Sequence, residues 1–213
     1  MSFDELTAKY QKRLATYGVG PQAVQWSDHV TQLNRFKILT QVVRDYSTIN
    51  NILDFGCGLC DLNSYLRSKG ISSAYTGVDI VPEFIEIANM RMTHDKSANA
   101  ILTQPGEKIN EYYDIIFISG VFNNKINDNL KFIKNTLSML FEMTNIAIAF
   151  NALSTHVEYF DDELFYVDPT ELFNFCKIEL GGNILLKHDY VLKPNGFPYE
   201  FTIYLYKNID FSL

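Results

Sequence analysis

The residues of this chain best suited to chemistry lie between Asn51 and Leu62, where the sequence reads NILDFGCGLCDL. An apolar pair leads into Asp54, two glycines follow at alternate positions, and a helical pattern then begins. This order predicts a strand, a glycine-rich turn and a helix, the first unit of a nucleotide-binding fold. Because glycine lacks a Cβ atom, such a turn is tight and lets a ligand approach the backbone closely.

Acidic residues on both sides of the turn indicate the charge of its ligand. A dinucleotide would place its pyrophosphate at the N-terminus of the helix, but Asp61 is predicted as the N-cap and Asp54 lies just before Gly56. At about 4 Å and an effective dielectric constant of about 20, each carboxylate would repel a phosphate charge by roughly 4 kcal/mol. A cationic ligand suits the turn better.

The turn resembles motif I of the class I S-adenosylmethionine-dependent methyltransferases, which is an acid followed by three glycines at alternate positions. Asp54, Gly56 and Gly58 match this motif, and Cys60 replaces the third glycine. The resemblance implies that S-adenosylmethionine is the cofactor, with Cys57 among its contacts. The two cysteines also have the spacing of a redox or zinc pair, but no second pair lies nearby, so we expect no metal site.

Later positions fit the same family. Residues 74–79 are predicted to form a strand that ends in Asp79, about twenty residues after the glycine turn, where an acid can accept hydrogen bonds from both ribose hydroxyls. Ile80 then offers an apolar face to adenine. Gln104 follows the predicted strand at 98–103, where related enzymes usually carry an acid, and it keeps an acceptor for the adenine amino group.

The predicted strand at 112–119 is a nearly continuous apolar run, as expected of a strand buried on both faces. It opens into a loop that faces the transferring methyl group in this family. The resemblance therefore implies that Ser119 and Gly120 contact the cofactor, and that Phe122 and Asn123 contact the methyl acceptor.

The N-terminal segment is predicted to form two helices, at 1–20 and 28–46, from its apolar residues at helical spacing. In many methyltransferases of this shape, a helix before motif I covers the cofactor. We therefore expect residues 1–48 to form a lid and residues 49–213 to form the methyltransferase domain. Arg35 would then pair with the methionine carboxylate, and a solvated helix face is the alternative for it.

Two histidines are candidates for the general base that a hydroxyl acceptor would need. His156 follows the predicted strand at 145–150, and His188 lies near the end of the predicted strand at 184–190. An incidental position is the alternative for each. The aromatic and acidic connections around them suit a small polar acceptor, such as a sugar, a carboxylic acid or a metabolite hydroxyl. The tyrosines expected to contact it are Tyr159, Tyr190 and Tyr199.

The last two predicted strands, at 184–190 and 201–207, are joined by a loop too short for a crossover helix, so they should be antiparallel. A parallel sheet that closes with one antiparallel strand distinguishes the methyltransferase version of the Rossmann fold. The predicted fold is a three-layer α/β sandwich around a mostly parallel, seven-stranded sheet whose last strand is antiparallel.

Length and charge limit the remaining possibilities. The 213 residues suit one domain, and a net charge of −7 without any Lys/Arg run argues against a nucleic-acid partner. No apolar run reaches the roughly 18 residues that a membrane span needs, so we expect a cytoplasmic protein. Two alternative functions stay open. One is a non-catalytic scaffold that binds S-adenosylmethionine, and the other is an NAD-dependent oxidoreductase, which would need a GxGxxG turn.

Overall fold

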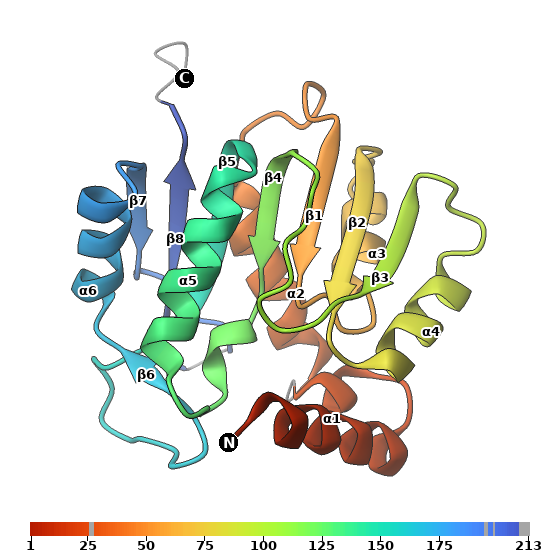
Figure 1. Cartoon of the computed structure of the whole chain (residues 1–213), viewed down its shortest axis with the longest axis horizontal. Helices are drawn as coiled ribbons and strands as arrows, with labels where there is room; N and C mark the ends of the chain where they lie inside the picture. Colours follow the sequence, from red (N-terminus) through yellow and green to blue (C-terminus); the bar gives the residue numbers. More distant parts are fainter. Residues whose placement is uncertain (26–27, 194–195, 198, 209–213) are drawn as a thin grey trace.

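A central sheet runs through the protein in the strand order β3-β2-β1-β4-β5-β8-β7, and the short strand β6 pairs with the end of β5 (Figure 1). This computed structural model describes residues 1–25, 28–193, 196–197 and 199–208. The strands are β1 (Asn51–Phe55), β2 (Ala74–Asp79), β3 (Ala98–Leu102), β4 (Tyr113–Ile118), β5 (Thr144–Ser154), β6 (Tyr166–Val167), β7 (Asn183–Lys187) and β8 (Glu200–Tyr206).

Strand β8 runs against its neighbours, and the other strand pairs on β1 to β5 are parallel. It lies between β5 and β7, with Phe150 opposite Ile203 and Leu185 opposite Tyr204. The predicted sheet, mostly parallel with an antiparallel final strand, is confirmed.

Helices cover both faces of the sheet because side chains alternate along each strand. Ile116 and Ile118 of β4 pack with α5 and α6, whereas Ile115 and Phe117 pack with α2, α3 and α4. All four side chains are fully buried, and each such burial contributes about 1.5–3 kcal/mol. The helices are α2 (His29–Leu39), α3 (Asp61–Ser68), α4 (Pro82–Arg91), α5 (Asn129–Glu142) and α6 (Pro169–Asn174), and a π-helical turn at Phe175–Glu179 follows α6.

The N-terminal helix α1 (Phe3–Tyr17) lies across the edge of the sheet where β1, β2 and β4 end (Figure 1). A short 3₁₀ turn, η1 (Pro21–Val24), connects it toward α2. Tyr10 packs edge-on against Phe84, and Ala23 is completely buried in the same apolar cluster. The first part of the chain is therefore docked against the carboxyl edge of the sheet, where ligands bind in open α/β folds.

The structure differs from the predicted elements at several points. The second helix ends at Leu39 and continues only as a 3₁₀ turn to Val42, because Thr40 bonds back to Phe36 and the Tyr46 hydroxyl binds the Thr40 carbonyl. Strand β5 continues four residues beyond the predicted end at 150. Strand β6 was not predicted. In the described part of the chain, no helix is long and apolar enough to cross a membrane.

Candidate functional site

A cavity of about 430 Å³ opens at the carboxyl edge of the sheet. Its walls come from the glycine turn after β1, the end of β2, the loops after β3 and β4, and the N-terminal helices. The cavity therefore lies at the point between β1 and β4 where the strand order reverses, which is the usual ligand site of an open parallel sheet.

The glycine turn has a left-handed backbone at three positions. The φ angles of Gly56, Gly58 and Cys60 are 75°, 54° and 56°, so Cys60 adopts the conformation that glycine would hold with less strain. Cys60 also occupies the cap position of α3, which corrects the predicted N-cap at Asp61. Asp61 is the first residue of the helix, and its carboxylate accepts a hydrogen bond from Arg91 at 2.7 Å.

Asp79 joins this turn to the end of β2. Its carboxylate oxygens accept hydrogen bonds from the backbone N–H groups of Gly58, at 2.8 Å, and Val81, at 3.0 Å. Burial raises the pKa of Asp79, and these two hydrogen bonds act in the opposite direction. Because each carboxylate oxygen can accept two hydrogen bonds, Asp79 keeps acceptor capacity for a ligand in the cavity that it lines.

Asp54 is a second buried acid in the cavity wall. Its side chain is 2% exposed and accepts a hydrogen bond of 2.6 Å from the Tyr75 hydroxyl. Burial raises the pKa of Asp54 to about 7, and the nearby charges of Asp79 and Asp61 act in the same direction. A cation placed in this half of the cavity would favour the ionised carboxylate.

Every residue predicted to bind the cofactor lines this one cavity. The ten residues are Arg35, Asp54, Gly56, Cys57, Gly58, Asp79, Ile80, Gln104, Ser119 and Gly120. Arg35 is almost fully buried, and its guanidinium forms an ion pair with Glu200, which is also buried. If Arg35 pairs with the methionine carboxylate as predicted, the same guanidinium must bind both that carboxylate and Glu200.

The predicted acceptor contacts divide into two groups. Asn123 and Tyr199 line the cavity. Phe122 does not, because its ring is 1% exposed and packs edge-on against Phe132 and Phe150 in the core. This placement corrects the expectation that Phe122 contacts the acceptor.

Two predicted tyrosines are also outside the cavity wall. Tyr159 is 75% exposed on the loop after β5. Tyr190 is buried, and its hydroxyl bonds to Glu200 and Thr202 at the start of β8. Burial raises the pKa of Tyr190, and Glu200 adds to the effect. Neither tyrosine reaches an acceptor in this cavity.

Neither histidine lines the cavity. Strand β5 extends to Ser154 and β7 ends at Lys187, so both histidines follow strand ends at the carboxyl edge, as expected, but lie outside the cavity wall. Their ring centroids are 6.1 Å apart, and burial lowers the pKa of His188. We therefore do not assign His156 or His188 as the base.

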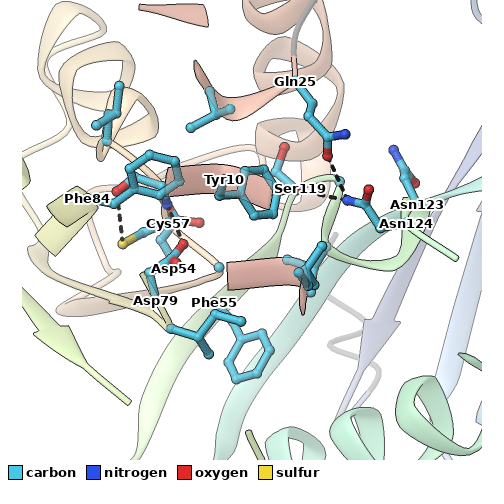
Figure 2. Close-up of a pocket in the computed structure, with 18 of the residues that line it drawn as sticks. Tyr10, Gln25, Asp54, Phe55, Cys57, Asp79, Phe84, Ser119, Asn123 and Asn124 are labelled. Carbon is cyan, nitrogen blue, oxygen red and sulfur yellow. Dashed lines mark hydrogen bonds between the residues drawn. The ribbon is translucent and has the colours of Figure 1, made fainter. Parts of the chain in front are cut away.

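The sequence reasoning missed a group of uncharged polar residues on the opposite side of the cavity from Asp54 and Asp79 (Figure 2). Asn124 is 4% exposed, and its amide donates to the Tyr10 hydroxyl at 2.9 Å and to the Gln25 side chain at 2.7 Å. The signal available in the sequence was the pair Asn123 and Asn124 within the predicted methyl-facing loop.

The loop between β5 and β6 forms the rim of this polar half. Its end is held to the loop after β4 by backbone hydrogen bonds, from Phe165 to Asn123 at 2.9 Å and from Lys125 to Glu163 at 3.1 Å. Pairing of β6 with the last residues of β5 holds the same loop from the other side. These contacts bring Asp161 and Glu163 to the cavity.

Comparisons with known proteins agree with this site. Residues 53–142 match the family described as "Methyltransferase domain". Rv1506c of Mycobacterium tuberculosis, which is named as a methyltransferase, is 32% identical over 163 residues, and the match covers 74% of this chain and 93% of that protein. The chain belongs to the S-adenosylmethionine-dependent methyltransferases.

Solved structures of methyltransferases share the fold. The magnesium protoporphyrin IX methyltransferase of Synechocystis PCC 6803, with bound S-adenosylhomocysteine, has a TM-score of 0.72 at 13% identity, covering 96% of this chain and 97% of that chain. A methyltransferase from Clostridium acetobutylicum has a TM-score of 0.62 at 15% identity, covering 96% and 98%. The antiparallel β8 is thus part of the methyltransferase architecture.

The cavity of this methyltransferase fits a cationic cofactor. Acids line one half, and the glycine turn offers close backbone approach. Three buried oxygen atoms of wall residues have no hydrogen-bond partner among the described residues: Gln32 Oε1, Ser119 Oγ and Asn123 Oδ1. Since buried polar atoms are almost always hydrogen-bonded, these oxygens are available to a ligand. In the described part of the chain, no three His, Cys, Asp or Glu side chains are grouped to hold a metal.

Proposed function

We propose that this methyltransferase acts on a hydroxyl group of a small polar acceptor, such as a sugar or another metabolite. The observation that supports this proposal is the uncharged, oxygen-rich wall beside Ser119. Ser119 Oγ and Asn123 Oδ1 are buried without partners among the described residues, and Asn124, Gln25 and Tyr10 continue the same wall. Such groups accept hydrogen bonds from a ligand that carries O–H donors.

A carboxylic acid suits this half of the cavity less well. A carboxylate is best held by Arg or Lys, but Lys9 forms an ion pair with Glu163, and Arg13 donates to the Gln22 carbonyl. Asp161 and Glu163 add negative charge at the rim. The site therefore favours a neutral hydroxyl over an anionic acceptor.

When bound, S-adenosylmethionine supplies a methyl group on a positively charged sulfur. The residues of the chain then have to hold the acceptor oxygen in line with that methyl group, and proximity of this kind can supply most of the acceleration. Asn123 and Ser119 orient the hydroxyl. Asp161 lines the cavity, and its carboxylate would take up the proton that the hydroxyl loses when the methyl group leaves the sulfur, whose bond electrons stay on the sulfur.

Residues 1–48 are proposed to act as a lid over this site. Phe3, Leu6 and Tyr10 of α1 and Gln32 and Arg35 of α2 all contribute to the cavity wall. A bound cofactor and acceptor would thus be separated from water on this side by the N-terminal helices, which must move for exchange.

Two measurements test the proposed function. Calorimetry should detect binding of S-adenosylmethionine and S-adenosylhomocysteine but not of NAD, which separates a methyltransferase from an oxidoreductase. Release of S-adenosylhomocysteine in the presence of a panel of sugars, alcohols and carboxylic acids should then occur with hydroxyl compounds. Turnover with carboxylic acids alone would contradict the hydroxyl acceptor, and cofactor binding without turnover on any panel member would favour a non-catalytic scaffold.

A variant pair tests the orienting role of Asn123. Asn123→Ala should lower kcat/KM for a hydroxyl acceptor by about tenfold to a hundredfold, because a buried hydrogen bond to the acceptor is lost, with cofactor affinity nearly unchanged. Asn127→Ala is the matched control, since Asn127 is exposed and its side chain accepts a hydrogen bond from the N-terminal amine, away from the cavity wall. Equal effects of the two substitutions would remove Asn123 from the acceptor site.

A further inference from the structure

Asn151 is an unexpected residue at its position. It lies in the middle of β5, within the apolar run from Ala147 to Leu153, and none of its surface is exposed. An amide buried without partners would cost about 1–3 kcal/mol. Both ends of this side chain are occupied, however, and both partners belong to parts of the protein that build the cofactor cavity.

The hydrogen bonds of Asn151 define its orientation. Its Oδ1 atom accepts from the backbone N–H of Gly120 at 2.9 Å, and its Nδ2 donates to the Glu200 carboxylate at 3.2 Å. A backbone N–H can only donate and an ionised carboxylate can only accept, so the amide has a single satisfactory orientation. The side chain therefore connects the turn after β4 to the start of β8.

The bond to Gly120 also determines where the preceding carbonyl points. Gly120 has a left-handed backbone, with φ of 75°, and lines the cavity, whereas Asn151 is buried behind it. In a planar trans peptide the C=O and N–H groups point in opposite directions. Since the Gly120 N–H is directed into the protein toward Asn151, the Ser119 carbonyl is directed toward the cavity, where its partial negative charge can face a cation.

Glu200 extends the connection to the N-terminal segment. Its carboxylate accepts from Asn151, from the Tyr190 hydroxyl at 3.1 Å and from the Arg35 guanidinium of α2. Glu200 is 1% exposed and Arg35 is 2% exposed, so the ion pair is not screened by water. One buried carboxylate thus holds a helix of the proposed lid and the turn that faces the methyl group.

We propose that Asn151 and Glu200 are positioning residues of the methyltransferase site. Asn151 holds the Ser119–Gly120 peptide so that its carbonyl faces the positively charged part of S-adenosylmethionine, and Glu200 fixes Asn151 and Arg35 together. Neither residue touches the cofactor. This inference rests on the proposed use of the cavity for S-adenosylmethionine, and it assigns a role to two residues outside the cavity wall.

The experiment compares Asn151→Leu with Asn63→Leu. Asn63 is also buried, at 3% exposure, and donates to a carboxylate, Asp95, at 3.3 Å, but it is remote from Gly120. Calorimetry would measure the affinities for S-adenosylmethionine and S-adenosylhomocysteine, which lacks the positive sulfur. Amide hydrogen exchange would report directly on the Gly120 N–H.

For Asn151→Leu we expect faster exchange at Gly120 and about tenfold weaker binding of S-adenosylmethionine, with a smaller loss for S-adenosylhomocysteine, because a carbonyl dipole near a full charge is misplaced. Asn63→Leu should leave both the exchange and the affinity ratio unchanged. An unchanged ratio in a folded Asn151→Leu variant would overturn the proposal. If wild-type protein binds neither ligand, the cofactor assignment of the cavity is what has failed.

Should Asn151→Leu not fold, Asn151→Asp decides the question. The aspartate keeps an oxygen toward Gly120 but replaces the donor to Glu200 with a second acid. Exchange at Gly120 should then stay near that of the wild type below the pKa of the new pair and increase as pH rises, because two carboxylates repel each other when both are ionised. If the ratio of the Gly120 exchange rates in Asn151→Asp and in the wild type did not change with pH, the role of Glu200 would be contradicted.

Discussion

Asp54 is the residue whose protonation is expected to respond to the cofactor. Its pKa of about 7 in the folded protein is far above its usual value of about 3.9, so the native state retains a proton that the unfolded chain has released. The protein without ligand should therefore lose stability as pH rises from about 4 to 7. A cation bound nearby favours the ionised form and reverses part of this shift.

Binding of S-adenosylmethionine should accordingly release protons near pH 7, and its affinity should increase from about pH 6 to pH 8 by up to roughly tenfold. Calorimetry in buffers with different ionisation enthalpies measures the proton release. Asp54→Asn should abolish it, and the uncharged product S-adenosylhomocysteine should release fewer protons. Equal release by the wild type and Asp54→Asn would show that another group, such as Asp79, is responsible.

Asp79 is expected to bind the ribose, and it also accepts a hydrogen bond from the glycine turn. Its replacement should therefore affect both the ligand contact and the turn. Asp79→Asn should weaken S-adenosylmethionine and S-adenosylhomocysteine to the same extent, by about 1–3 kcal/mol, because both carry the same ribose and the turn loses an acceptor for Gly58. Asp114→Asn is the matched control. Asp114 is a buried acid that accepts the Asn50 N–H at the opposite edge of the sheet. Wild-type affinity in Asp79→Asn would remove Asp79 from the site.

At the residue scale, all the residues expected to bind the cofactor line one cavity, whereas several of those expected near the acceptor lie outside its wall. Asp54, Gly56 and Asp79 lie within or next to strands and turns whose geometry is local, so their positions follow from the sequence. His156 and His188 lie beyond strand ends that were placed only approximately. Strand β5 continues four residues beyond its predicted end, and His156, two residues after it, does not line the cavity.

Among the elements, the glycine turn and the loop after β4 are packed closely enough to exclude a single methyl group. A Cβ atom on Gly56 would lie 2.3 Å from Cγ2 of Val121. Gly56→Ala should therefore separate the two cofactor-binding loops and weaken cofactor binding by at least about tenfold, besides the strain of about 1–2 kcal/mol that a left-handed residue carries.

Gly70→Ala is the control that separates these two causes. Gly56 and Gly70 both have φ of 75°, but a Cβ atom on Gly70 meets nothing within 4 Å. Thermal unfolding should show a similar backbone cost in the two variants, with an additional loss only for Gly56→Ala. Calorimetry should show that Gly70→Ala retains wild-type affinity for S-adenosylmethionine. If Gly56→Ala and Gly70→Ala had the same stability and the same affinity for S-adenosylmethionine, the contact between Gly56 and Val121 would have no effect on cofactor binding.

The predicted end of a strand was wrong where a polar residue interrupts an apolar pattern. Asn151 suggested the end of a strand, although its amide is satisfied inside the sheet by Gly120 and Glu200. Nothing local to the sequence reveals such distant partners. Conversely, the helix predicted to reach Tyr46 stops at Leu39, because a threonine hydroxyl and a tyrosine hydroxyl compete for the last carbonyls.

For the whole molecule, the N-terminal helix is attached by both apolar and polar side chains. Phe3 packs against Phe132 and Tyr10 against Phe84, and Tyr10 also accepts from Asn124. The ion pair of Lys9 with the exposed Glu163 contributes only about 0–1 kcal/mol. If α1 is part of a lid, as proposed, these contacts must open when ligands exchange.

Bound cofactor should slow the opening of this segment. Hydrogen exchange in α1 should decrease several-fold on saturation with S-adenosylmethionine, since a ligand that binds the closed form shifts the population toward it. NAD at the same concentration is the control, and α6, which contributes no residue to the cavity wall, should not respond. Unchanged exchange in α1 while calorimetry shows binding would contradict the lid.

The overall architecture was predictable because it depends on patterns repeated along the chain. Continuous apolar strands indicate a sheet buried on both faces, and the short final connection requires an antiparallel strand. The docking of α1 across the carboxyl edge was implied only by the family resemblance. Its contacts join residues more than 100 positions apart, such as Tyr10 and Asn124.

The rim loop between β5 and β6 has a consequence for engineering. Its anchors at Asn123, Lys125 and β6 are backbone hydrogen bonds, which any residue except proline can supply. Residues 157–160 can therefore be exchanged for other sequences of the same length while Asp161 and the frame of the loop are kept. The rim is thus a natural place for a combinatorial library that redirects the enzyme to new acceptors.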